Sequence, residues 1–313
     1  MLHRLLMVND WLSKRMFLIV LTGLLSGLWI QIPNPRSLSG LAVVLFAYMT
    51  FVTALSTSLK KFLQVAKNPG IPLWILFLVH FVTPIFAWCL GLIFHPFEPD
   101  IRLGYLIGAS VPIGVTSIIW TSIVKGNVSI SLVSVTLDTF FAPLFLPFYF
   151  TWIAGHSIPI NYLAMMQELF LMITLPSLIG MLFYDISKGK WTPVINSLGG
   201  ITSKIAFFFV IFINASIVMP EILWNLSILK VLLLTLTLSA SGYLLGYLGA
   251  LPLKDSSREA VLTVVYNVGL RNIAFGVVVA LTYFPPGTAI PVTLAMLFQQ
   301  PLAALIPHVK KKR

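Results

Sequence analysis

Two charged side chains occur inside long apolar segments, where charge is costly. Arg271 lies within the segment 261–276, and Asp138 lies about ten residues into the segment 128–153. An arginine at the centre of a bilayer costs at least about 2.5 kcal/mol, so charges at that depth usually face a wet cavity and mark a site. A buried carboxylate and a buried guanidinium offset each other's desolvation. These two residues therefore predict a charged site within apolar surroundings.

The composition excludes a water-soluble globular protein. Hydrophobic residues make up 58% of the 313 positions and charged residues only 9%. Apolar segments long enough to cross about 30 Å of hydrocarbon recur from end to end. The sequence therefore predicts an all-α, multi-pass membrane protein with ten transmembrane helices, at 16–32, 37–58, 71–95, 103–123, 128–153, 160–184, 201–220, 227–250, 258–284 and 287–308.

The basic residues predict the orientation of these helices, because loops rich in lysine and arginine stay cytoplasmic. Sixteen lysines and arginines fall on one side, among them Lys14, Lys67, Lys254 and the run 310–313, and three fall on the other. We expect both termini to be cytoplasmic, in the cell membrane. The net charge of +11 is then a sign of topology and of contact with the lipid bilayer, and no nucleic acid is expected as a partner.

The chain repeats a short pattern at a fixed distance. The segment 112–119 has the same pattern as 267–274, at an offset of 155 residues, and 135–144 is echoed by 292–302 at an offset of 157. The single domain, 1–313, would then hold two halves, 10–155 and 156–309. Each half has five spans, an odd number, so the second half enters the membrane in the opposite sense. Such inverted repeats are a signature of secondary transporters.

The repeated segments also predict where two helices are interrupted. Pro112 and Gly114 in one copy, and Asn267 and Gly269 in the other, suit a break at mid-depth. A break frees backbone N–H and C=O groups, which hydrocarbon cannot satisfy but a substrate or water can. A lone proline or glycine would favour an ordinary kinked helix. Two matched copies, one of them beside Arg271, favour the interruption.

Three of these segments carry a resemblance to a known family. The segments 112–117 and 125–131, followed by Pro143, resemble the fourth and fifth helices of the bile acid:sodium symporter family, and 268–272 resembles the ninth. The resemblance implies a panel domain and a core domain, with broken fourth and ninth helices that cross near the midplane. It also implies alternating access for a small organic anion, bile-acid-like or a smaller carboxylate.

The residues that would bind sodium in that family are largely replaced here. The resemblance implies sodium ligands on the fourth, fifth and ninth helices, of which Ser117 and Ser131 are retained. An asparagine is replaced by Ile118, a threonine by Val135, a glutamate by Asn267 and a glutamine by Arg271. The third-helix glutamine falls at Val79 or His80.

A guanidinium at the sodium site opposes binding of that ion. At about 5 Å and an effective dielectric constant of about 20, two positive charges repel by about 3 kcal/mol, which is more than about a hundredfold in affinity. Sodium also prefers oxygen ligands with compensating negative charge. We therefore expect no sodium at these positions, no other metal site and no cofactor.

A different coupling scheme follows from Asp138. It is seven residues from Ser131 and so shares its helical face. In this hypothesis Arg271 stands in permanently for sodium, and Asp138 gains and loses a proton, so that a proton and an anion travel together. The alternative is a static pair of Asp138 with Arg271 that only locks the crossing. Thr116, Ser117, Asn267 and Asn272 are expected to line the site, and His80 either titrates or packs.

Other functions stay open at this point. A sodium-coupled organic anion symporter of the same family is one, and a membrane sensor or regulator that does not transport is another. An arsenite effluxer is disfavoured because the related carriers use a fourth-helix cysteine that is missing here. An intramembrane enzyme is disfavoured because Ser117, Ser131, Asp138 and His80 match no recognised catalytic spacing.

Overall fold

The computed structural model describes residues 2–13, 15–30, 32–65, 69–154, 161–222, 225–253 and 257–309, and these are almost entirely helical. A chain this apolar must satisfy its backbone polar groups internally, which a helix does within one segment. The helices are α1 (Leu2–Ser13), α2 (Met16–Trp29), α3 (Ser39–Ala54), α4 (Leu59–Val65), α5 (Gly70–Phe77), α6 (Thr83–Phe94), α7 (Pro99–Ser110), α8 (Thr116–Ile123), α9 (Val128–Tyr149), α10 (Tyr162–Leu169), α11 (Leu175–Ile186), α12 (Thr192–Val194), α13 (Gly200–Val218), α14 (Leu226–Ala250), α15 (Arg258–Gly269), α16 (Ile273–Tyr283) and α17 (Ala289–Val309).

Seven continuous helical segments in the described part are long and apolar enough to cross a membrane. They are Pro35–Ala54, Gly70–Phe94, Val128–Trp152, Tyr162–Ile186, Thr192–Val218, Leu226–Leu253 and Pro286–Ile306. Several are assembled from two helices joined by a wider turn, such as Leu78–Val82, a π-helical turn that joins α5 to α6. Each of the seven coincides with a span predicted from the sequence.

The other three predicted spans contain shorter helices. The range 16–32 holds α2, 103–123 holds α7 and α8, and 258–284 holds α15 and α16. The total of ten transmembrane helices therefore stays a prediction. Lys14, Lys67, Lys254 and the run 310–313, on which the predicted orientation partly depends, lie outside the described residues.

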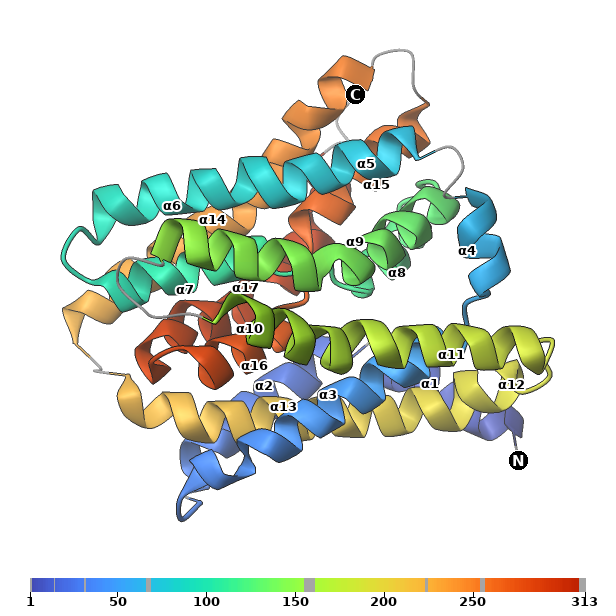
Figure 1. The fold of residues 1–313 in the computed structure, drawn as a ribbon, viewed down its shortest axis with the longest axis horizontal. Coiled ribbons are helices and arrows are strands. Elements are labelled where there is room, and N and C mark those ends of the chain that lie inside the picture. Colours follow the sequence, from blue (N-terminus) through green and yellow to red (C-terminus); the bar gives the residue numbers. More distant parts are fainter. Residues whose placement is uncertain are drawn as a thin grey trace.

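The helices form two groups that lie side by side. In Figure 1, α2, α3, α11 and α13 lie together in the lower part, and α13 packs on both α2 and α3. The second group lies above them and contains α5 to α9 and α14 to α17, with α17 packed on α7, α14 and α16. α16 sits deep in the protein, and every residue from Ile273 to Ala280 is buried.

Large apolar side chains are exposed along the outer helix faces. On the segment from α5 to α6, Leu73, Phe77, Phe81 and Ile85 recur every four residues and are 41–53% exposed. This spacing puts them on one helical face. A continuous apolar stripe of this kind is costly in water and suits contact with lipid chains.

Candidate functional site

The second group of helices is organised around two interruptions. α7 ends at Ser110 and α8 begins at Thr116, while α15 ends at Gly269 and α16 begins at Ile273. The first interruption contains Pro112 and Gly114, as the sequence predicts. The second comes later than expected, because Asn267 and Gly269 are still helical. The Asn267 side chain donates to the carbonyl of Thr263 one turn back (2.8 Å), which ties it into α15.

The two interruptions cross and pair with each other. Ile113 lies opposite Arg271 in an isolated antiparallel bridge. The N–H of Gly114 donates to the carbonyl of Leu270 (3.0 Å), and the N–H of Asn272 donates to the carbonyl of Pro112 (2.7 Å). The two bonds are equivalent if Gly114 corresponds to Asn272 and Pro112 to Leu270, which is an offset of 158 residues between the two segments. This offset is three residues more than the 155 predicted from the sequence.

Gly114 makes this close approach possible. A Cβ atom at this position would lie 2.9 Å from the carbonyl oxygen of Arg271, closer than such contacts normally allow. The absence of a side chain therefore lets the two backbones reach hydrogen-bonding distance.

Side chains from neighbouring helices form hydrogen bonds with backbone groups of Ile113 and Arg271 that face away from the bridge. The N–H of Ile113 donates to Oδ2 of Asp138 on α9 (2.6 Å). On the other segment, the amide of Gln299 on α17 donates to the carbonyl of Arg271 (3.0 Å) and accepts from its N–H (3.1 Å), in the orientation that satisfies both groups. Side chains thus pair the N–H of Ile113 and both backbone groups of Arg271.

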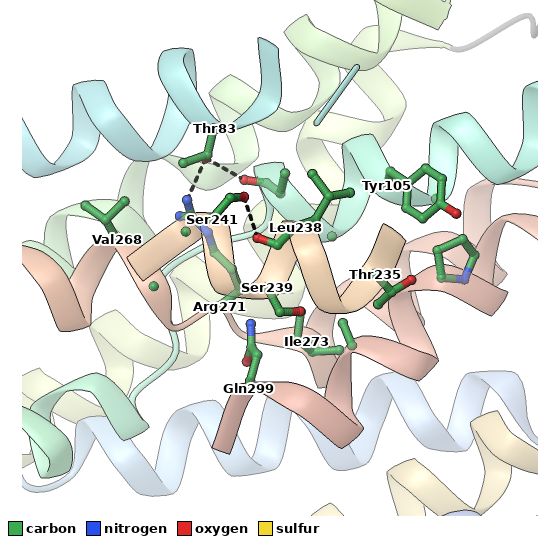
Figure 2. A pocket seen from close by; sticks show the side chains of 17 residues that line it. Thr83, Tyr105, Thr235, Leu238, Ser239, Ser241, Val268, Arg271, Ile273 and Gln299 are labelled. Atoms are coloured by element: carbon green, nitrogen blue, oxygen red, sulfur yellow. Dashed lines mark hydrogen bonds between the residues drawn. The ribbon is translucent and has the colours of Figure 1, made fainter. Parts of the chain in front are cut away.

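The Arg271 guanidinium is held inside the protein by one neutral partner. The residue is only 7% exposed, and Nη2 donates to Oγ1 of Thr83 on α6 (2.6 Å). The Thr83 hydroxyl in turn reaches the carbonyls of Val79 (2.9 Å) and Ala109 (3.2 Å). Nη1 of Arg271 is buried without a hydrogen-bond partner. Figure 2 shows the side chain extending away from Gln299 toward Thr83.

Asp138 contacts His80, and the expected direct contact with Arg271 is not formed. Both residues of the Asp138–His80 pair are fully buried, with Nε2 of His80 bonded to Oδ1 of Asp138. No ion pair or hydrogen bond joins Asp138 to Arg271, both of which are described residues, although the carboxylate still acts on the guanidinium through space. The Phe145 ring lies against the imidazole, with centroids 4.6 Å apart. The wide turn Leu78–Val82 carries His80 to this position, and such π-helical turns are frequent at functional sites.

A second cluster joins Asn267, Ser117 and Ser131, all fully buried. Oδ1 of Asn267 accepts from the Ser117 hydroxyl (3.3 Å) and lies 3.1 Å from Ser131 Oγ, while Nδ2 of Asn267 lies 3.0 Å from the same Ser131 oxygen. The cluster therefore links α8, α9 and α15 through neutral hydrogen bonds. The Asn267 amide nitrogen donates to the hydroxyl oxygen of Ser131. A bound cation would need that oxygen as a ligand.

Thr116 and Asn272 differ from the others in being partly exposed. The Thr116 hydroxyl accepts from Nε2 of Gln300 (3.3 Å), whose Oε1 accepts from the indole N–H of Trp120 (2.9 Å). Asn272 begins α16, and its side-chain oxygen accepts from the N–H of Phe275 (3.3 Å). Both residues thus stand at the starts of helices that open at the crossing.

A small cavity lies beside Arg271. Its volume is about 50 Å³, and its walls come from α6, α7, α14, α17 and the second interruption. Serine and threonine side chains contribute Thr83, Thr235, Ser239 and Ser241, and glycines contribute Gly104, Gly108, Gly242 and Gly269. Figure 2 shows Ser239, Ser241 and Thr235 on α14, on the same side as Arg271.

Comparison with known proteins shows the family of the chain. The model of the sodium bile acid symporter family matches residues 40–225. The chain belongs to this family. An uncharacterized protein, YbaS of Bacillus subtilis (strain 168), is 32% identical over 270 residues, which cover 85% of this chain and 87% of that protein.

Two more distant members of the family carry names that describe transport. The uncharacterized sodium-dependent transporter YocS of Bacillus subtilis (strain 168) is 22% identical over 81% of this chain and 78% of its own length. The probable chloroplastic sodium/metabolite cotransporter BASS1 of Arabidopsis thaliana is 27% identical over 74% of this chain and 57% of its own length. The family's name describes symporters, which are membrane transport proteins.

Sequence reasoning missed several residues that the symporter fold brings to the crossing. Thr83 holds the Arg271 side chain, Gln299 binds its backbone, and Gln300 reaches Thr116. The two adjacent glutamines in the last apolar segment were a usable signal, because amides at that depth need partners. Thr83 offered no such signal, since a threonine in a helix commonly bonds to its own backbone.

Proposed function

We propose that this protein is a secondary transporter that moves a small organic anion, bile-acid-like or a smaller carboxylate, by alternating access, without sodium at the crossing. The observation that carries this proposal is the buried Arg271 guanidinium, which among the described residues bonds only to the neutral Thr83 hydroxyl, at the point where two interrupted helices cross. A fixed positive charge at that point attracts an anion and repels an alkali cation.

The proposal includes a fold of ten transmembrane helices in two inverted halves, 10–155 and 156–309, of one domain, 1–313. The reciprocal bonds of Gly114 with Leu270 and of Asn272 with Pro112 support it, because exchange of the two segments reproduces the same pattern. We place the protein in the cell membrane with both termini in the cytoplasm, from the distribution of its lysines and arginines.

The Asn267 cluster supports the absence of sodium. The resemblance to the family assigns a glutamate to this position, and here a neutral amide bonds directly to Ser117 and Ser131. A sodium ion would have to displace these hydrogen bonds and would gain no carboxylate in return.

The Asp138–His80 pair is the proposed proton carrier. With neutral His80 and ionised Asp138, the pair carries one negative charge, which balances Arg271 through space. One added proton neutralises the pair and leaves a net positive charge at the crossing, which favours a monovalent anion. Transport of one proton with one monovalent anion is then electroneutral. Arg271 and the Tyr149 ring are the other titratable groups near the pair.

A second candidate is a sodium-coupled symporter, which the names of YocS and BASS1 favour. Uptake of a panel of radiolabelled organic acids into proteoliposomes separates the two. We expect accumulation driven by an imposed pH gradient, inside alkaline, with N-methyl-D-glucamine as the only cation. Stimulation by a sodium gradient alone would favour the second candidate, and binding without accumulation would favour a sensor.

A further inference from the structure

The cavity beside Arg271 contains one fixed charge and nothing of opposite sign in its walls. None of the residues that line it, all of them described, carries a carboxylate. The nearest negative group, Asp138, is engaged by His80 and by the N–H of Ile113. A buried charge with one neutral hydrogen bond is expensive unless a counter-ion joins it.

Unpaired hydrogen-bond donors also indicate that the cavity binds an anion. Nη1 of Arg271 and the hydroxyl of Thr235 are both buried without a partner, and both residues belong to the wall of this cavity. Buried donors of this kind normally have a partner, so each unpaired group calls for an explanation. Arg271 lies in the second interruption and carries the charge, so an anion in the cavity would meet its guanidinium, whereas Figure 2 shows Thr235 farther along α14, beyond Ser241 and Ser239.

The size of the cavity limits what can enter. A volume of about 50 Å³ has room for about three to five water molecules, at about 10–15 Å³ each. This suits a halide ion or a carboxylate group and excludes a fused-ring body, which would have to remain outside. Gly108 keeps the space open, because a Cβ atom there would meet nothing within 4 Å.

We propose that this cavity is a binding site for one small monovalent anion, a carboxylate group or a chloride ion, with the Arg271 guanidinium as its positive charge. The site deepens the proposed function but does not depend on transport, because binding can be measured on the purified full-length protein. The carboxylate would be the head group of the substrate, and chloride would be a competing or resident ion.

Binding is tested by the thermal stability of the protein in detergent. Salts of N-methyl-D-glucamine with a bulky buffer anion that has no carboxylate, MES, are replaced stepwise by chloride, formate or acetate at constant ionic strength. A ligand that binds only the folded state raises the melting temperature in a saturable manner. We expect a saturable rise with formate and acetate, and either the same rise with chloride or none. An equal rise with chloride would show a general site for small anions, and no rise with chloride would show a site selective for carboxylates.

Two variants place the site at this cavity. Gly108→Ala adds a methyl group to open space inside the cavity and should weaken the anion affinity at least tenfold, with an unchanged melting temperature in MES. Gly40→Ala is the matched control, because its Cβ also meets nothing within 4 Å, and it should keep the parent affinity. Arg271→Gln, which removes the charge, should weaken binding as well.

The outcomes separate this site from the proposed transport. Absence of any saturable anion effect in the parent protein, or an unchanged effect in both Gly108→Ala and Arg271→Gln, overturns the anion site. Saturable binding without uptake in proteoliposomes leaves the site in place and removes the transport proposal. Uptake inhibited competitively by chloride shows that both anions share the cavity.

Discussion

Ile113 and Arg271 lie opposite each other in an antiparallel bridge, and the backbone N–H of each is bound by a side chain from another helix. Asp138 takes the N–H of Ile113, and Gln299 takes both groups of Arg271. The same carboxylate that bonds to His80 therefore also holds the backbone of the crossing. A change of charge on Asp138 acts directly on the interrupted segment, which gives protonation a physical route to a conformational change.

Removal of the Arg271 charge should remove anion uptake. Arg271→Gln keeps an amide that can bond to Thr83 but loses the charge. Hydrogen bonds to charged groups contribute about 1.5–3 kcal/mol, so we expect uptake to fall by about tenfold to a hundredfold. Arg271→Lys keeps a charge and should retain part of the activity. Proton-driven uptake by Arg271→Gln at the parent rate would refute the role of the guanidinium.

The Asp138–His80 pair should couple uptake to protons. Asp138→Asn keeps an oxygen acceptor for the N–H of Ile113 but cannot change charge. We expect its uptake to lose the stimulation by a pH gradient, while exchange of labelled for unlabelled substrate continues. Thr139→Val, which removes a neighbouring hydroxyl that bonds only to its own helix, is the control. Undiminished stimulation in Asp138→Asn would exclude this carboxylate as the proton site.

The sequence predicted the elements better than their contacts. Seven long apolar segments appear as continuous helices, and Pro112 and Gly114 fall in the first interruption. The second interruption was placed about three residues early, because the local pattern cannot tell a helix-ending asparagine from Asn267, which bonds back to Thr263. Asn272, which caps α16, is the residue that begins the next helix.

The partners of the charged residues could not be derived from spacing. Asp138 shares a helical face with Ser131, but the two serve different clusters, Asp138 with His80 and Ser131 with Asn267. The choice depends on the wide turn at Leu78–Val82, which aims His80 inward. Such a turn depends on the packing of several helices, so it cannot be predicted from a single segment of the sequence.

Sodium binding should be recoverable by two substitutions. The double variant Asn267→Glu with Arg271→Gln restores a carboxylate and an amide at the positions where the family resemblance implies sodium ligands. We expect sodium to stabilise this variant against heat in a saturable manner, while the parent protein shows no such effect. Asn267→Glu alone is the control, because Arg271 still repels the cation. Sodium-dependent stabilisation of the parent would show that its site already accepts the ion.

A side chain at position 114 should destabilise the protein, because the two backbones approach each other closely at the crossing. In Gly114→Ala the new Cβ would meet the Arg271 carbonyl oxygen at 2.9 Å. Forced contacts in packed interiors typically cost about 1–3 kcal/mol, so the melting temperature should fall. Gly40→Ala, whose Cβ meets open space, should leave the melting temperature unchanged. Equal stability of the two variants would mean that the backbones separate at little cost.

A histidine outside the spanning helices should make stability depend on pH. His95 lies between α6 and α7, 1% exposed, with Nδ1 bonded to Glu98 (3.0 Å) and Nε2 to the Tyr105 hydroxyl (3.1 Å). Burial lowers the pKa of His95, against the opposite influence of the Glu98 carboxylate. A base with a lowered folded-state pKa contributes stability that is complete above its unfolded pKa, about 6.5, and is lost as the pH falls. We expect the melting temperature to decline below that pH in the parent protein and to decline less in His95→Gln. His3→Gln, at an exposed position of α1, should follow the parent, and an equally steep decline in His95→Gln would assign the acid sensitivity to other groups.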